Sequence, residues 1–110
     1  MLATRSRLSR QEDILAVLRG GRIYKSSVAK IYIKGSSSPA ISRACVIVGK
    51  TVSKKAVIRH RYQRQLRQVA KKIITKSTNP IDVVIIAAPA ITGVKTLRDI
   101  IHSVGQTGVL

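Results

Sequence analysis

The chain has 110 residues, of which 45% are hydrophobic, enough for one compact domain with one core but not for two. Its 21 Lys and Arg outnumber four Asp and Glu, so the formal net charge is +17. The clusters of carboxylates that metal-dependent nucleases gather around their ions are therefore nearly absent. A surface this basic is tolerated most readily when a polyanion neutralises it, and nucleic acid is the commonest one. A solvated basic surface and binding to a membrane surface are the alternatives.

The first predicted element is a helix over residues 10–19. Ser9 and Glu12 form a Ser-x-x-Glu capping box at its start, and Gly20 with the next glycine marks its end.

Three strands are predicted after this helix. Residues 28–34 alternate between apolar and polar side chains, which indicates a half-buried strand. Residues 43–48 predict a second, more buried strand, and we expect these two strands to be antiparallel neighbours. Residues 81–88 are almost uninterruptedly apolar, as in a strand that is buried on both faces. Residues 50–55 are polar and are expected to hold a short strand or a turn.

A long helix is predicted to begin near Ala56. Apolar residues recur along it at spacings of three and four, and at about 100° per residue they share one side that faces the core; they are Ile58, Tyr62, Leu66, Val69 and Ile73. Basic residues recur on the opposite side: His60, Arg64, Arg67 and Lys71, with Arg61 beside them and Arg59 near the apolar boundary. A last amphipathic helix is predicted over residues 97–104 and ends at Gly105.

These elements predict an α+β fold in the order αβ(β)βαβα. The expected architecture is a single-domain α/β sandwich, in which a central mixed sheet is packed by helices. Residues 1–110 are assigned to one RNA-binding domain, and we expect residues 1–7 and 106–110 to be flexible.

Cys45 is the only cysteine, so no disulfide can form within the chain, and its apolar neighbours indicate a small buried side chain. The longest apolar run, residues 83–91, is interrupted by Pro89 and falls short of the roughly 20 residues that a membrane-spanning helix requires. The basic N-terminal residues lack the apolar segment of a secretory signal. A cytoplasmic protein without a membrane partner is expected.

The strongest functional signal lies between Lys50 and Lys76, where ten Lys or Arg residues occur without one Asp or Glu. No carboxylate occurs anywhere between Ile14 and Ile81. This pattern predicts an RNA-binding protein.

The segment from Ala56 to Gln68 resembles the signature of the bacterial ribonuclease P protein component, Ala-Val-x-Arg-Asn-x-x-Lys-Arg-x-x-Arg-Glu. Residues 8–14 are similar to the family's first helix, and the order of elements matches from about Leu8 to Val104. The chain departs from the signature at three positions, where His60 replaces Asn, Gln63 replaces Lys and Gln68 replaces an acidic residue.

The resemblance implies a fold like domain 2 of ribosomal protein S5 and the function of a ribonuclease P protein subunit. In this family the catalytic site belongs to the RNA subunit, which removes the 5′ leader of precursor tRNA with bound Mg²⁺. The implied partners are therefore ribonuclease P RNA and precursor tRNA, with Mg²⁺ held mainly by the RNA; no obligate protein partner is inferred.

Two sets of site residues follow. The first binds the phosphates of folded RNA, because guanidinium groups match phosphate oxygens in pairs; it comprises Lys50, Lys54, Lys55, Arg59, His60, Arg61, Arg64, Arg67 and Lys71. The second set forms the cleft for the single-stranded leader. Tyr32 is either its stacking residue, where the family's first-helix aromatic side chains are missing, or a residue that only packs at the sheet surface. The set comprises Ile14, Leu18, Lys30, Tyr32 and Lys34.

Two other classes remain open at this point. A ribosomal or other structural RNA-binding protein has the same charge and the same small fold, and only the signature argues against it. A DNA-binding module is disfavoured because no helix-turn-helix or zinc-ligand spacing is found. A protein-catalysed nuclease is disfavoured because His60 and His102 belong to different helices and Cys45 has no nearby base.

Overall fold

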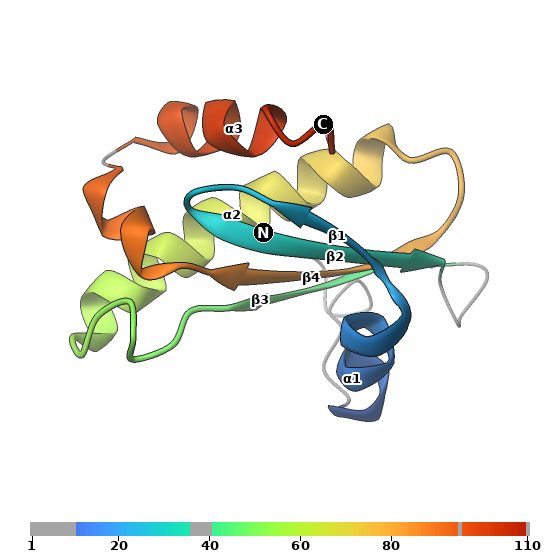
Figure 1. Cartoon of the computed structure of the whole chain (residues 1–110), viewed down its shortest axis with the longest axis horizontal. Helices are drawn as coiled ribbons and strands as arrows, with labels where there is room; N and C mark the ends of the chain where they lie inside the picture. The colour runs from blue at the N-terminus through green and yellow to red at the C-terminus, as the bar shows by residue number, and fades with distance from the viewer. Residues whose placement is uncertain (1–10, 36–40, 95, 110) are drawn as a thin grey trace.

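The computed structural model describes residues 11–35, 41–94 and 96–109 (Figure 1). The elements in chain order are α1 (Gln11–Gly20), β1 (Arg22–Lys25), β2 (Ala29–Gly35), β3 (Arg43–Ile47), α2 (Ala56–Lys76), β4 (Ile81–Ala87), the 3-10 helix η2 (Pro89–Gly93) and α3 (Leu97–Gly105). The predicted α+β order is thereby confirmed. The capping box of Ser9 lies outside the described residues.

The four strands form one mixed sheet in the order β1-β2-β4-β3. β2 pairs antiparallel with both β1 and β4, whereas β3 pairs parallel with β4. The expectation that β2 and β3 are antiparallel neighbours is wrong, because β4 lies between them. The chain returns from β3 through α2, and such a helical crossover brings the next strand back in the same direction, so β4 takes its place beside β3 as a parallel strand.

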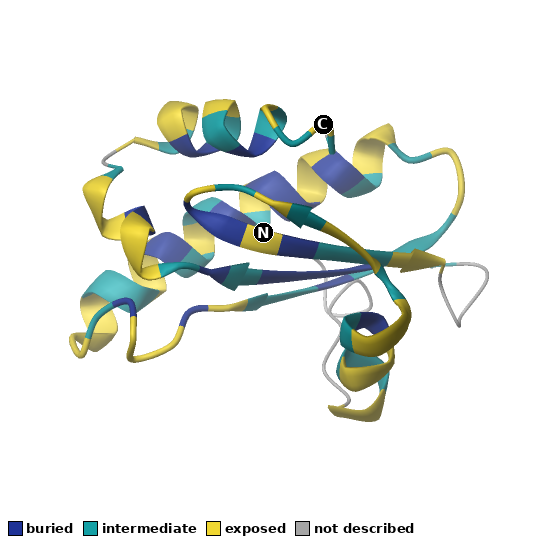
Figure 2. Cartoon of the chain, viewed as in Figure 1, coloured by how far each residue is buried: buried dark blue, intermediate teal, exposed yellow. Residues whose placement is uncertain are grey.

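The helices cover the two faces of the sheet unequally (Figures 1 and 2). α2 and α3 pack on one face over the main core, whose largest fully buried side chains include Ile31, Leu66, Ile85 and Ile100. α1 packs on the other face, where it covers only one end of the sheet. Successive side chains of each strand point to opposite faces of the sheet, so neighbouring residues in a strand contribute to different surfaces.

The long helix begins at Ala56, as predicted, and its apolar side is buried at Tyr62, Leu66, Val69 and Ile73. The sequence did not predict β1, Arg22–Lys25, and residues 50–55 form a turn rather than a short strand. A strand of four residues is too short to show a clear alternation of polar and apolar side chains, and β1 is stabilised by its pairing with β2. No helix in the described part of the chain is long and apolar enough to cross a membrane.

Gly21 allows the end of α1 to pack closely against the sheet. Its N–H donates to the carbonyl oxygen of Val17 at 2.8 Å. A Cβ at this position would lie 2.5 Å from that oxygen and 3.0 Å from the carbonyl oxygen of Ile33 in β2. Only a glycine allows the end of α1 and the backbone of β2 to approach this closely.

Candidate nucleic-acid interface

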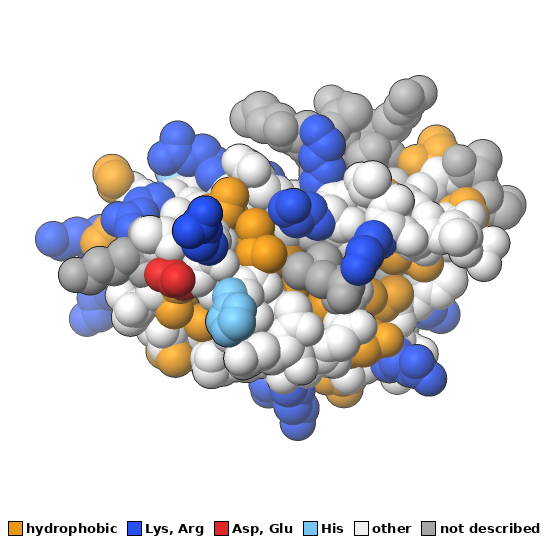
Figure 3. All heavy atoms as spheres, turned by 90° about the horizontal axis from the view of Figure 1, so that it is seen from above, with side chains coloured by type: hydrophobic (Ala, Val, Ile, Leu, Met, Phe, Trp, Pro, Cys, Tyr) orange, Lys and Arg blue, Asp and Glu red, His pale blue; other side chains and the backbone are white. Residues whose placement is uncertain are grey.

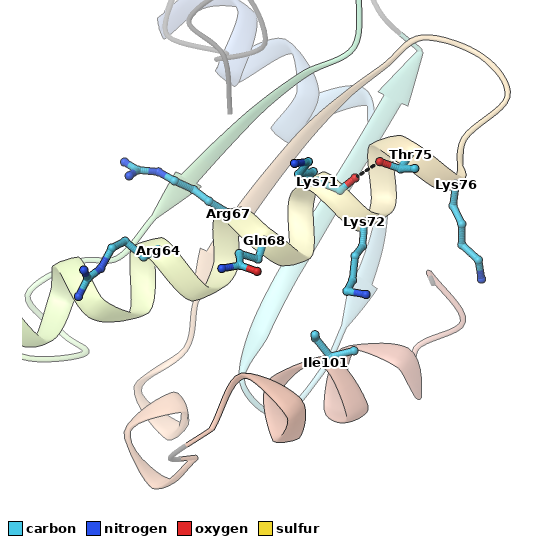
Figure 4. Close-up of a pocket in the computed structure, with 8 residues that line it drawn as sticks. All are labelled: Arg64, Arg67, Gln68, Lys71, Lys72, Thr75, Lys76 and Ile101. Atoms are coloured by element: carbon cyan, nitrogen blue, oxygen red, sulfur yellow. Dashed lines mark hydrogen bonds between the residues drawn. The ribbon is translucent and has the colours of Figure 1, made fainter. Parts of the chain in front are cut away.

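A hollow lies along the exposed side of α2, beside α3 (Figure 4). The hollow measures about 760 Å³, and five of its lining residues are cations: Arg64, Arg67, Lys71, Lys72 and Lys76. Gln68, Thr75 and Ile101 complete the lining, which contains no carboxylate. Three predicted RNA-binding residues are thus brought together, and two cations absent from the prediction, Lys72 and Lys76, join them.

The side chains around this hollow point in different directions (Figure 4). Lys72 extends from α2 toward Ile101 of α3, whereas Arg67 extends to the other side of the helix. Arg67 is near enough to β3 for its charge to act on the thiol of Cys45. The basic surface of α2 therefore has two flanks, one toward β3 and one toward α3.

The other predicted phosphate contacts lie around the start of α2. Lys50, Lys54 and Lys55 are exposed in the preceding turn, and His60 is exposed on the helix. They do not line the hollow. The guanidinium carbon of Arg61 lies 5.4 Å from the centroid of the Tyr62 ring, within the range of a cation–π interaction.

Arg59 has a structural partner in the preceding turn. Its Nη1 donates hydrogen bonds to the carbonyl oxygens of Ser53 at 3.0 Å and Lys54 at 2.9 Å. Because two carbonyl groups share one guanidinium nitrogen, Arg59 ties the lysine-bearing turn to the first turn of α2. Its half-buried position suits this role.

The predicted leader cleft lies on the sheet face that carries α1, which we call the cleft face. Lys30, Tyr32 and Lys34 all lie on this face, because the intervening residues of β2 pack in the main core. Tyr32 is half-buried and packs in one cluster with Ile14 and Leu18 of α1. The structure therefore brings together the helix and strand residues of the predicted cleft.

Lys34 lies beside the end of α1 rather than over the open part of the cleft face. Its Nζ is 3.5 Å from the point where a Cβ on Gly20 would stand. The carboxyl end of a helix attracts cations, so this position favours the ammonium group.

The open part of the cleft face contains residues that the sequence did not single out. Lys25 of β1 stands directly opposite Lys30 of β2, and like charges in such a pair repel each other. Exposed apolar side chains accompany them, with Ile23 at 47% and Ile47 at 36% relative exposure. Two facing ammonium groups above apolar side chains suit an anionic ligand that also has apolar surface.

One ionic cluster holds α1 on the cleft face. Arg43 of β3 donates from Nε and Nη2 to the two carboxylate oxygens of Asp82, at 3.2 and 3.1 Å, and from Nη1 to Asp13 of α1 at 3.2 Å. Hydrogen bonding to Asp82 raises the pKa of the Arg43 guanidinium, against the opposing effect of burial. Asp82 is the one buried charged residue of the described chain. This cluster was not among the residues predicted from the sequence, although an Asp within an apolar strand is a signal for a buried partner.

Titratable groups that could perform chemistry do not gather in the described residues. No three His, Cys, Asp or Glu side chains there form a group that could hold a metal ion. Burial raises the pKa of the Cys45 thiol, and the nearby charge of Arg67 only partly offsets this effect. Figure 3 shows the face that carries α3, where Lys and Arg side chains are spread widely and acidic side chains are scarce. The arrangement is suited to binding a polyanion.

Comparisons of the sequence with known proteins all match ribonuclease P proteins. The sequence model of the ribonuclease P family matches residues 2–101. A ribonuclease P protein component of Pseudanabaena sp. is 32% identical over 85 residues, which cover 77% of this chain and 73% of the relative. Another from Synechocystis sp. is 30% identical over 107 residues, covering 94% and 86%.

Solved structures share the fold. The RNase P protein of Staphylococcus aureus matches with a TM-score of 0.78 at 19% identity, covering 93% of this chain and 91% of that one. The RNase P protein from Thermotoga maritima matches with a TM-score of 0.74 at 16% identity, covering 93% and 94%.

Proposed function

The chain belongs to the ribonuclease P protein family, and on that premise we propose how its two faces serve the ribonucleoprotein. It is the protein subunit of ribonuclease P, acts in 5′-end processing of tRNA and forms a complex with ribonuclease P RNA. The cleavage itself takes place on the RNA subunit, and the protein supplies binding. The following contacts support this division.

The basic side of α2 docks on the phosphates of ribonuclease P RNA. The observation that carries this proposal is the convergence of Arg64, Arg67 and Lys71 around one hollow whose lining has no carboxylate. Guanidinium and ammonium groups bind phosphate oxygens without regard to base sequence, which suits a folded RNA. The turn that Arg59 ties to α2 adds Lys50, Lys54 and Lys55, with His60 and Arg61 at the start of the helix.

The cleft face holds the single-stranded 5′ leader of precursor tRNA. Unpaired nucleotides need a surface that meets both phosphates and bases, and Lys30 lies next to Tyr32 along β2. Ile14 and Leu18 of α1 border this surface, and Lys34 extends it toward the end of the helix. Lys25, which faces Lys30, provides a further cation for the leader.

Mg²⁺ belongs to the RNA subunit in this proposal. The protein's own carboxylates do not fit a metal site, because Asp13 and Asp82 are both bound to Arg43. No group of three or more possible ligands occurs among the residues that are described. The protein lowers the magnesium requirement indirectly, since its cations neutralise close phosphates and let the RNA fold with fewer ions. We place the complex in the cytoplasm.

Cleavage of a labelled precursor tRNA at limiting Mg²⁺ tests this function. We expect 5′-leader removal to require the ribonuclease P RNA of the same source and to be strongly enhanced by the protein. A protein that binds RNA without altering cleavage would instead be a structural RNA-binding protein.

A charge reversal then tests the docking surface. The double variant R64E/R67E should raise the magnesium concentration needed for cleavage and weaken binding to ribonuclease P RNA. The matched control is R19E/R22E, which makes the same change in net charge at two exposed residues that do not line the hollow. An unchanged magnesium requirement in R64E/R67E would contradict the indirect role in metal dependence.

A further inference from the structure

We propose that the flank of α2 that faces α3, centred on Lys72 and Lys76, extends the RNA-docking surface by binding the backbone of double-helical RNA. This inference rests on the proposed function, since the RNA belongs to the same ribonucleoprotein. It adds a second wall, α3, and two cations that lie outside the family signature segment, residues 56–68.

The direction of the side chains distinguishes the two sides of the hollow. Lys72 follows Arg67 by five residues, which turns it about 140° around the helix axis. Arg67 accordingly extends away from α3, whereas Lys72 extends toward Ile101 of α3. An RNA backbone along the hollow therefore meets Lys72 and Lys76 on one side and Arg67 on the other.

The charges of the hollow call for an anionic occupant. Lys72 and Lys76 are four residues apart on a helix, a spacing at which like charges repel. The carboxyl end of α2 favours Lys76, but its field falls off within the last turn and does not explain Lys72 or Arg64. No carboxylate lines the hollow to offset them. A phosphate backbone would relieve this repulsion.

The chemistry of the lining favours backbone contacts over base contacts. No aromatic residue lines the hollow, and single-stranded RNA is usually held by stacking on aromatic rings. The Thr75 hydroxyl already donates to the carbonyl oxygen of Lys71 at 2.7 Å, so it is engaged within the helix. The hollow therefore offers ammonium and guanidinium groups beside Ile101, which suits phosphates and sugars of a folded duplex.

The length of the flank suits more than one phosphate. From Arg64 to Lys76 the helix rises about 18 Å, at roughly 1.5 Å per residue. The cleft face lies on the opposite side of the sheet, under α1, and carries Tyr32, the ring that the α3 flank lacks. Double-helical RNA on one side and single-stranded RNA on the other can thus be bound at the same time.

The charge-reversal variant K72E/K76E tests this site, with R19E/R22E as the control of equal charge change. Two quantities are measured: the affinity of the protein for ribonuclease P RNA, and the ratio of holoenzyme affinities for precursor tRNA with and without its leader. We expect K72E/K76E to weaken RNA binding at least tenfold while the leader ratio stays within twofold of wild type. R19E/R22E should bind the RNA within threefold of wild type.

Charge-preserving and salt measurements complete the test. K72R/K76R should retain wild-type affinity, and replacement of both lysines by Gln should make the slope of log affinity against log salt shallower by about 1.4–1.8. Circular dichroism checks that each variant folds. Wild-type affinity in K72E/K76E, or equal weakening in R19E/R22E, would overturn the site. If wild-type protein fails to bind the RNA or to promote cleavage, the proposed function fails instead.

Discussion

Arg43 and Asp82 form a two-pronged ion pair across neighbouring parallel strands, and the same guanidinium reaches Asp13 of α1. The carboxylate of Asp82 is almost inaccessible, with 4% side-chain exposure, whereas that of Asp13 is 26% exposed. The pair thus anchors a helix of the cleft face to β3 and β4 at one end of the sheet.

Replacing Asp82 by Asn should lower the free energy of unfolding by about 3 kcal/mol, because the half-buried Arg43 guanidinium loses the more deeply buried of its two carboxylate partners. Asp13→Asn should cost about 1 kcal/mol, because water reaches its carboxylate. Asp99→Asn, at an exposed position in the first turn of α3, is the chemical control and should cost less than about 1 kcal/mol. Urea unfolding measures all three, and equal costs at Asp82 and Asp99 would contradict the anchoring role. The apolar double replacement R43M/D82L should recover part of the loss, since it leaves no unpaired buried charge.

Gly21→Ala should destabilise the protein by about 1–3 kcal/mol, because its Cβ would collide with two backbone oxygens that cannot move independently. The neighbouring change Gly20→Ala is the matched control. A Cβ there meets only the flexible end of Lys34 at 3.5 Å or more, so Gly20→Ala should be neutral or stabilising. Thermal unfolding of the two variants decides the matter; if both melt like the wild type, α1 does not depend on the close approach at Gly21.

Tyr32→Ala should reduce the contribution of the leader to precursor binding by about 1–3 kcal/mol, because a stacking ring is lost. Tyr32→Phe keeps the ring and should bind the leader like the wild type. The measurement is the ratio of holoenzyme affinities for precursor tRNA with and without the leader, which cancels a general loss of folded protein. An unchanged ratio in Tyr32→Ala would leave Tyr32 as a packing residue only.

The thiol of Cys45 should react slowly with iodoacetamide at pH 8. It packs beside Val17 and Val84 under α1, and burial raises its pKa, so less thiolate is present than in an unfolded chain with an ordinary pKa of about 8.5. Alkylation should be at least about tenfold faster in urea, and Val17→Ala should speed it in the folded protein by loosening the contact with α1. Equal rates in the folded and unfolded chains would show that α1 does not shield the thiol.

Part of the interface could be predicted from single elements. The side of α2 that carries Arg64, Arg67 and Lys71 follows from a period of 3.6 residues, and the alternation in β2 separates Lys30, Tyr32 and Lys34 from the core. These are local properties, because each depends on residues within one turn or one strand of each other. Their assignment to RNA phosphates and to the leader remains a prediction.

Other parts depend on contacts between distant segments. β1 shows no pattern of its own and exists through its pairing with β2, so the facing pair of Lys25 and Lys30 could not be foreseen. Lys72 and Lys76 line a hollow only because α3 packs beside α2 and forms its second wall.

The sequence by itself determined the types of the longer helices and strands, the basic side of α2 and the family of the protein, because periodicity, charge and a signature are properties of short segments. Only the tertiary structure decided that β4 separates β2 from β3 and that Asp13, Arg43 and Asp82 meet. These contacts join residues that are 30 and 39 positions apart. Their formation depends on the packing of the whole sheet, which no local pattern of side chains records.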